Sequence, residues 1–194
     1  AIKKTADQQN LPEVAALATI VKVQAMHRVT DAYGPIPYNN YGSGTLQNTY
    51  NSQEDVYKKF FEELDAAIDV LTLYVQGNPS ARLLQKYDYI YGGNVSNWIK
   101  FANTLRLRLA MRIVYANAVL AQTEAEKSVA HPFGLISSLN ERAALQRSVN
   151  LTYYHPLQEI AYSFNAGEAR MSASMDAYMN GYADPRRAAY FTKA

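Results

Sequence analysis

The sequence predicts an all-α fold, an irregular helical bundle with long loops. Three long segments repeat apolar residues three and four positions apart, which is the spacing of one face of an α-helix. Stretches that contain proline and glycine separate these segments, and none alternates apolar and polar residues as a half-buried strand would. A chain of 194 residues is long enough for one domain with a hydrophobic core.

The first predicted helix runs from Pro12 to about Asp31. Proline suits a first helical turn because its missing N–H would have no partner there. The segment GPIP at residues 34–37 ends the helix, since proline cannot continue it and restricts the residue before. Arg28 and Asp31 are expected to pair side chain to side chain at this corner. The apolar stripe of this helix comprises Val14, Leu17, Val21 and Ala25.

The second predicted helix begins at Ser52, because a serine followed three residues later by Asp55 is typical of a capped helix start. The segment GNP at residues 77–79 ends it. The third lies within residues 91–113, where Trp98 on the apolar face is expected to be a core residue. The second helix is acidic and the third is basic, so these two charged faces are expected to meet each other or solvent.

Shorter elements follow in the last third of the chain. Thr123 with Glu126 predicts a capped short helix that stops near Pro132. Residues 135–144 could form one or two helical turns, and residues 157–164 a short helix. A firmer helix is expected over residues 172–179, followed by Gly181 and a turn at Asp184-Pro185. The Arg186-Arg187 pair after that turn is expected to clamp carbonyls or an acid locally.

Composition excludes several classes of protein. The formal net charge of +2 argues against nucleic-acid binding as the main activity, which usually needs a strongly basic face. The chain has no Cys, so it forms neither a disulfide framework nor a thiolate zinc site. No run of apolar residues is long enough to span a membrane.

No catalytic constellation stands out, and the chain is predicted not to be an enzyme. None of His27, His131 and His155 lies at metal-ligand spacing from a second ligand residue, so no metal and no cofactor are expected. Nucleophile elbows, zinc-protease motifs and phosphate loops do not occur. The paired acids that glycoside hydrolysis requires cannot be assigned from spacing alone.

Tyrosine is the unusual component, with 16 Tyr against one Trp and six Phe. A phenol offers a flat apolar face and a hydrogen-bonding tip, which suits the C–H faces and hydroxyls of sugars as well as protein interfaces. The alternative is that each ring fills space between helices and loops. Because loops carry function more often than cores, the predicted ligand-binding residues lie in the loop after the first helix: Tyr38, Asn39, Tyr41 and Tyr50.

Four segments carry a recognisable pattern in a fixed order. They read RVTDAYGPIPY at residues 28–38, YNSQEDVYKKFFEELDAAIDVL at 50–71, YGGNVSNWIKFANTLRLRLAMRI at 91–113 and ARMSASMDAYMNGYADPRRAAYF at 169–191. Together they closely resemble the SusD/RagB-like family of outer-membrane nutrient-binding lipoproteins. The resemblance implies tetratricopeptide-like helix pairs. It also implies that residues 1–194 are a single partial domain of a longer chain, without the family's signal and lipidation segment and its C-terminal remainder.

The resemblance implies a function as well. It points to a non-catalytic cell-surface protein that binds a glycan of the starch or oligosaccharide type and delivers it to a SusC-like TonB-dependent transporter in the outer membrane. The lipid anchor would lie outside this chain. Two alternatives stay open at this point: a member of the same family that takes up peptides, and a helical-repeat scaffold that binds only proteins.

Overall fold

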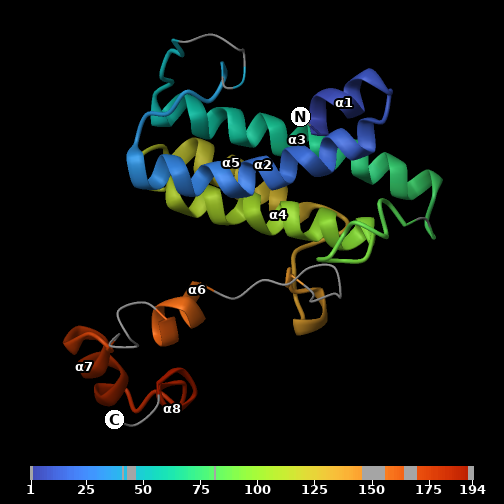
Figure 1. Cartoon of the computed structure of the whole chain (residues 1–194). Coiled ribbons are helices and arrows are strands. Elements are labelled where there is room, and N and C mark those ends of the chain that lie inside the picture. Colours follow the sequence, from blue (N-terminus) through green and yellow to red (C-terminus); the bar gives the residue numbers. More distant parts are fainter. Residues whose placement is uncertain are drawn as a thin grey trace. The chain divides into compact units, whose positions relative to one another are not determined.

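The computed structural model describes residues 2–40, 42, 47–80, 82–145, 156–163 and 170–191 (Figure 1). The chain divides into two compact units, an N-terminal unit of residues 1–146 and a C-terminal unit of residues 147–194. Within the described residues no strand is assigned, and none of the helices there is long and apolar enough to cross a membrane. The all-α prediction is therefore confirmed.

The N-terminal unit is built from antiparallel helix pairs. Helix α2 packs against α3, α3 against α4, and α4 against α5, and consecutive long helices run in opposite directions (Figure 1). This arrangement is the tetratricopeptide-like pairing expected from the resemblance. The helices of the unit are α1 (Ile2–Gln8), α2 (Pro12–Tyr33), α3 (Gln53–Gly77), α4 (Val95–Arg112) and α5 (Ala118–Ala130), with a short 3-10 turn, η1 (Leu139–Glu141).

Local signals placed the long helices correctly. Pro12 is the first residue of α2, and Gly34 follows its end with a positive φ of 73°. Ser52 caps α3, since its hydroxyl oxygen accepts a hydrogen bond from the backbone N–H of Asp55 at 3.1 Å. Asn94 caps α4 in the same way. Helix α1 was not predicted.

Helix α3 supplies the centre of the core. Its apolar stripe is almost completely shielded from solvent by α2 on one side and α4 on the other. Trp98 of α4 is buried as predicted, and its indole N–H donates to Asp88 at 2.8 Å, so the polar edge of the ring is also satisfied. The large side chains with under 2% exposure include Ile20, Val23, Phe60, Leu64, Ile68, Leu71, Ile99 and Leu109.

Ion pairs join the acidic and basic helix faces. The guanidinium of Arg106 in α4 lies 2.8 Å from Asp65 in α3 and 3.8 Å from Glu124 in α5. Lys127 reaches both of these acids, at 3.5 and 3.4 Å. The expectation that the two charged faces meet is confirmed here.

Three local predictions in this unit are wrong. In the stripe predicted for α2, Val21 is 50% exposed and Ala25 is exposed as well, whereas Ile20 and Val23 are buried. Helix α5 begins at Ala118 after an Asn117 cap, and Thr123 lies inside it with its hydroxyl donating to the carbonyl of Val119 at 3.0 Å. A threonine can bond backward within a helix as readily as it caps one, so the motif alone misplaced the start. Asp31 forms an ion pair with Arg112 of α4 at 3.0 Å instead of with Arg28.

The C-terminal unit contains short helices. The helix predicted over residues 172–179 is confirmed, with Ser172 as its cap, although Gly181 is the last residue of this helix instead of following it. The arginine clamp is confirmed too: Arg186 donates to the carboxylate of Asp184, and Arg187 lies 3.2 Å from Asp176. The elements are α6 (Pro156–Gln158), the π-helical turn η2 (Glu159–Ser163), α7 (Ala173–Gly181) and α8 (Arg187–Tyr190).

Candidate functional site

The loop between α2 and α3 stands on a short stem. Ile36 and Asn51 pair in antiparallel fashion through two backbone hydrogen bonds of 3.3 and 2.9 Å. The side-chain oxygen of Asn51 also accepts from the backbone N–H groups of Tyr38 and Asn39, at 3.1 and 2.9 Å. These four bonds close the loop at its base, so the residues beyond it start from a fixed position.

Tyr38 is the anchor of this stem. Only 6% of the residue is exposed, and its ring packs edge-on against Phe60 at a centroid distance of 5.1 Å. Its hydroxyl donates to Glu63 at 2.5 Å, and the ammonium of Lys22 lies 4.3 Å from the ring centre. Burial, and then the bond to Glu63, raise the pKa of Tyr38 far above its ordinary value, so the hydroxyl stays a donor.

The burial of Tyr38 corrects one part of the sequence prediction, which treated it as an exposed ring for a ligand. In the structure the ring is buried, with Phe60 and Lys22 packed against it, so it offers no exposed surface for a sugar to stack on. Asn39 and Tyr50 are exposed, and Tyr50 has 71% of its surface open to solvent. Tyr41 lies outside the described residues.

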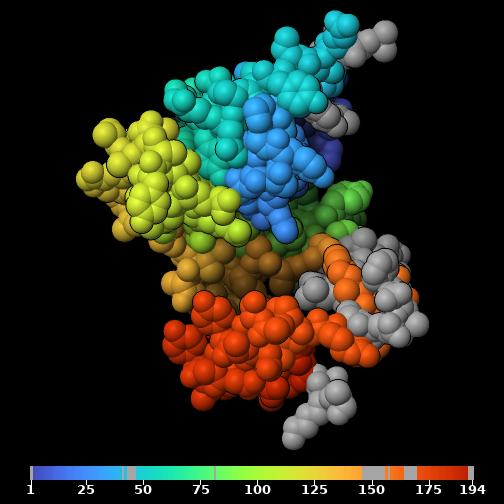
Figure 2. Space-filling model, turned by 90° about the vertical axis from the view of Figure 1, so that its left-hand side faces the viewer, coloured from blue at the N-terminus to red at the C-terminus, as the bar shows by residue number. Residues whose placement is uncertain are grey.

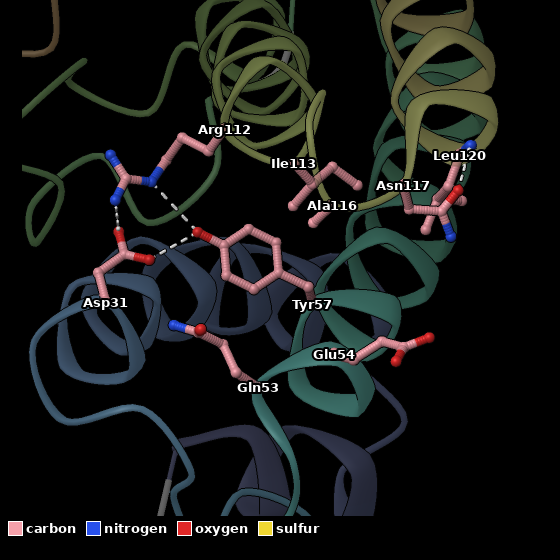
Figure 3. A pocket seen from close by; sticks show the side chains of 9 residues that line it. All are labelled: Asp31, Gln53, Glu54, Tyr57, Arg112, Ile113, Ala116, Asn117 and Leu120. Atoms are coloured by element: carbon pink, nitrogen blue, oxygen red, sulfur yellow. Dashed lines mark hydrogen bonds and ion pairs between the residues drawn. The ribbon is translucent and has the colours of Figure 1, made fainter.

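A cavity of about 360 Å³ opens where the ends of α2, α3, α4 and α5 meet (Figure 3). Figure 2 views this end of the N-terminal unit, with the blue end of α2 beside the cyan start of α3 and the yellow turn between α4 and α5. One wall is polar and the other is apolar. The lining residues are Asp31, Gln53, Glu54, Tyr57, Arg112, Ile113, Ala116, Asn117 and Leu120.

A triad of polar side chains forms the back of this cavity. The hydroxyl of Tyr57 donates to Asp31 at 2.6 Å and accepts from the guanidinium of Arg112 at 3.2 Å, while Arg112 and Asp31 pair at 3.0 Å (Figure 3). Burial and the bond to Asp31 raise the pKa of Tyr57 to about 12, so its phenol remains neutral. Each of the three side chains has the other two as its hydrogen-bond or ion-pair partners. The triad therefore links α2, α3 and α4 instead of forming an acid–base pair.

Sequence reasoning missed this triad. Its members come from three helices that are far apart in the chain, and each residue alone resembles an ordinary polar position. The predicted pair of Arg28 with Asp31 was a partial signal, since it marked Asp31 as an ion-pair residue but named the wrong arginine.

The two histidines in the described part of the chain have partners within the N-terminal unit. His27 is buried, with Nδ1 at 3.3 Å from the carbonyl oxygen of Val23, and burial lowers its pKa. The ring of His131 contacts Thr72, and burial lowers its pKa as well. His155 lies outside the described residues. Among the residues that the structure describes, no three His, Asp or Glu side chains are grouped to hold a metal ion.

Comparison with known proteins gives a consistent result. The family model SusD-like, described as SusD and RagB outer membrane lipoprotein, matches residues 1–194. A SusD homologue from Bacteroides uniformis is 41% identical, with a TM-score of 0.88 over 100% of this chain and 39% of its own. A chitin-binding SusD homologue from Flavobacterium johnsoniae is 42% identical, with a TM-score of 0.87 over 96% of this chain and 38% of its own.

These matches cover nearly all of this chain but only part of the length of each solved structure. A third structure, a SusD homologue from Bacteroides vulgatus, is 37% identical with a TM-score of 0.81 over 92% of this chain and 34% of its own. The chain thus spans less than two fifths of the length of these solved structures. A search of curated proteins finds no match.

Proposed function

Because the chain belongs to the SusD-like family of outer-membrane lipoproteins, we propose that it is part of a non-catalytic protein that binds a glycan at the cell surface and delivers it to a SusC-like TonB-dependent transporter. The family places the protein at the outer membrane. The solved homologue that binds chitin supports a glycan as the ligand class. We propose an oligosaccharide of the starch or related type for this chain.

The observation that carries the proposal is the loop stem. Asn51 and its partner Ile36 fix the base of the loop, and the buried Tyr38 ties it to α3 through Glu63. Asn39 and Tyr50 emerge from this base into solvent at its two ends. A rigid stem lowers the entropy cost of binding because the contact residues are already positioned.

The chemistry of these two residues suits a sugar. The ring of Tyr50 offers an apolar face for C–H groups, and the amide of Asn39 can donate to and accept from hydroxyls. Tyr41 completes the predicted set. In this arrangement Tyr38 acts by holding the loop in place.

The transporter would contact the helical scaffold. Apolar side chains stand exposed at the turn from α4 to α5, with 63% of Met111, 104% of Tyr115 and 78% of Val119 accessible. A group of this kind on a rigid corner suits a protein partner. The contacts of Arg112 with Asp31 and Tyr57 tie the end of α4 to α2 and α3 beside this corner, as docking onto a large partner requires.

Calorimetric titration of the full-length protein with a panel of polysaccharides and peptides tests this function. We expect glycan binding that weakens about 5- to 30-fold in Tyr50→Ala, because loss of one stacked ring removes about 1–2 kcal/mol. Tyr115→Ala, an equally exposed tyrosine on the α4–α5 corner, is the matched control and should bind as the wild type does.

The other results distinguish the alternatives. Glycan binding that Tyr50→Ala leaves unchanged would keep the function and move the site away from the loop. Binding to peptides alone would favour a peptide-uptake protein. If nothing small binds, the protein is a scaffold whose ligand is another protein, and the proposal is wrong.

A further inference from the structure

A second hollow lies at the opposite end of α4 from the cavity described above. Its volume is about 520 Å³, and it opens between the start of α4 and the segment that carries η1. The ring of Tyr91 and the side chain of Leu139 provide apolar surface. Asn97 of α4 and the residues Asn140 and Arg142 of the η1 segment supply polar groups.

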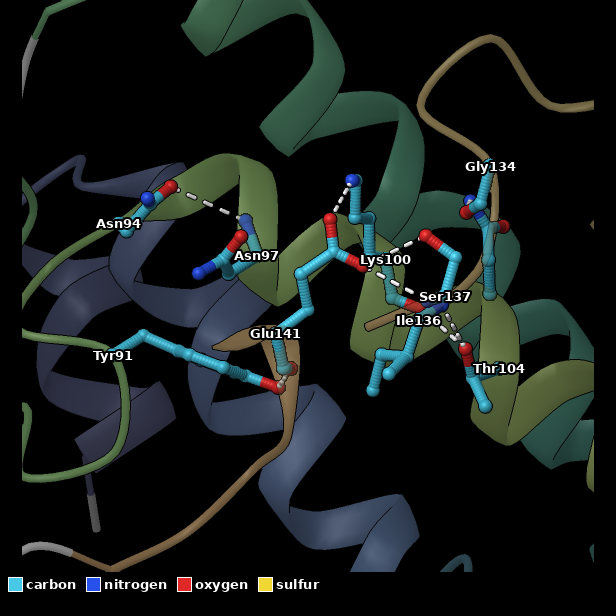
Figure 4. Close-up of polar contacts among 10 residues, drawn as sticks. Tyr91, Asn94, Asn97, Lys100, Thr104, Gly134, Ile136, Ser137 and Glu141 are labelled. Carbon is cyan, nitrogen blue, oxygen red and sulfur yellow. Dashed lines mark hydrogen bonds and ion pairs between the residues drawn. The ribbon is translucent and has the colours of Figure 1, made fainter. Parts of the chain in front are cut away.

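The walls of this hollow are held in place by contacts across α4 (Figure 4). Glu141 forms an ion pair with Lys100 of α4 and accepts the backbone N–H of Ser137 at 2.8 Å. The hydroxyl of Tyr91 donates to the carbonyl of Glu141 at 2.9 Å, and the backbone N–H of Ile136 donates to Thr104 at 2.9 Å. The η1 segment is therefore fixed to α4 through Lys100 and Thr104, and to the loop before α4 through Tyr91.

The loop on the other side is equally well fixed. The carboxylate of Asp88 accepts four hydrogen bonds, from the backbone N–H groups of Ile90, Tyr91 and Gly93 and from the indole of Trp98, at 2.8–3.1 Å. Tyr91 also packs edge-on against Trp98 at 5.3 Å. The Tyr91 ring thus has one orientation at the rim of the hollow.

Three polar groups in the hollow are free to bind a ligand. The side-chain amides of Asn97 and Asn140 and the guanidinium of Arg142 make no hydrogen bond or ion pair within the part of the chain that the structure describes. The carboxylate beside them, Glu141, is already neutralised by Lys100. Among the described residues that line the hollow, Arg142 is the charged one, so the lining carries a positive charge.

We propose that this hollow is a binding subsite for a carboxylate-bearing sugar residue such as a uronic acid. The fork of Arg142 would bind the carboxylate through two parallel hydrogen bonds. Asn97 and Asn140 would bind hydroxyls, and the C–H face of the sugar would lie on Tyr91 and Leu139. The inference rests on the proposed function in one respect, that the ligand is a saccharide.

The experiment compares trigalacturonate with the neutral trimer of galactose, each titrated into the full-length protein by calorimetry at low and high salt. We expect the acidic trimer to bind more tightly, and high salt to weaken that preference. Arg142→Gln should weaken trigalacturonate binding about 10- to 100-fold, the range for loss of a charge-assisted pair, and leave the neutral trimer unaffected. Asn97→Ala should weaken the binding of both trimers.

The control is Arg108→Gln, which removes an exposed arginine of α4 that does not line the hollow. Equal binding of trigalacturonate by Arg142→Gln and the wild type would overturn the proposal, as would no binding by the wild type. Tyr50→Ala separates the two sites. If Tyr50→Ala weakens the binding of neutral glycans while trigalacturonate binding still depends on Arg142, both proposals hold. If Arg142→Gln has no effect while Tyr50→Ala weakens glycan binding, only this subsite is wrong.

Discussion

The buried arginine of α4 offers a direct test of what holds the three central helices together. The side chain of Arg106 is 3% exposed and that of Glu124 is 7% exposed, so both charges lie inside the N-terminal unit. Arg106 bonds Asp65 at 2.8 Å, but its Nε has no hydrogen-bond acceptor and lies 3.8 Å from Glu124. Arg106→Met would remove the guanidinium and leave the buried Glu124 with the half-exposed Lys127 as its remaining counter-charge.

The loss of stability in Arg106→Met can be estimated from the residues around Arg106. Removing one partner of a buried ion pair generally costs about 3–5 kcal/mol, because the remaining charge stays desolvated. Lys127 lies 3.4 Å from Glu124, and Asp65 is 44% exposed, so solvent and lysine compensate part of the loss. We therefore expect Arg106→Met to lower the free energy of unfolding by about 2–3 kcal/mol.

Urea unfolding of the full-length protein, followed by helical circular dichroism, measures the change. The double variant Arg106→Met/Glu124→Gln should recover more than half of the loss, because the buried charge is then gone. Lys127→Met is the control; its side chain is 46% exposed, and we expect a loss below about 1 kcal/mol. If Arg106→Met is no more destabilising than Lys127→Met, or if the double variant recovers nothing, the reasoning about buried charge is refuted.

Two further predictions concern the segments on either side of the proposed subsite. Gly93 has a φ of +82°, and a Cβ there would lie 2.8 Å from the carbonyl oxygen of Leu83, so Gly93→Ala should lower the free energy of unfolding by about 1–3 kcal/mol in the same assay. Gly92 has a φ of +58° and open space around it, so Gly92→Ala should lower it less. Equal decreases in the two variants would contradict the clash at Gly93. Lys100, then Ser137, lower the pKa of Glu141 to about 2 from an ordinary value of 4.5, so its contribution to stability is present above about pH 4.5 and lost as the pH falls toward 2. Glu141→Gln should therefore be less stable than the wild type at neutral pH and equal to it near pH 2 in acid titrations, and a constant difference across that range would count against this ion pair.

The helices of this protein were predictable because their signals are local. The stripe of α3 and the pairing of Ser52 with Asp55 lie within a few residues of each other, so periodicity and capping placed the helix without any knowledge of its neighbours. The same held for the start of α2 at Pro12. Where a local signal had two interpretations, as at Thr123, the prediction failed, because the hydroxyl can bond backward inside a helix as well as cap one.

The proposed sites depended on contacts that no local pattern contains. The sequence predicted ligand-binding tyrosines in the loop after α2, yet it could not separate Tyr38, which is buried against Phe60, from Tyr50, which is exposed. Both are tyrosines in polar surroundings. Which one turns inward is decided by where Glu63 of α3 lies when the helices pack.

The sequence by itself determined the helical class, the family and the positions of the long helices, since these follow from residues close together in the chain. Only the tertiary structure decided that Asp31 pairs with Arg112, that Tyr57 completes the triad, and that Asn97 and Arg142 face one hollow. Such groupings arise when helices pack, because packing brings together side chains from elements that are far apart in the chain and buries some while leaving others open to a ligand.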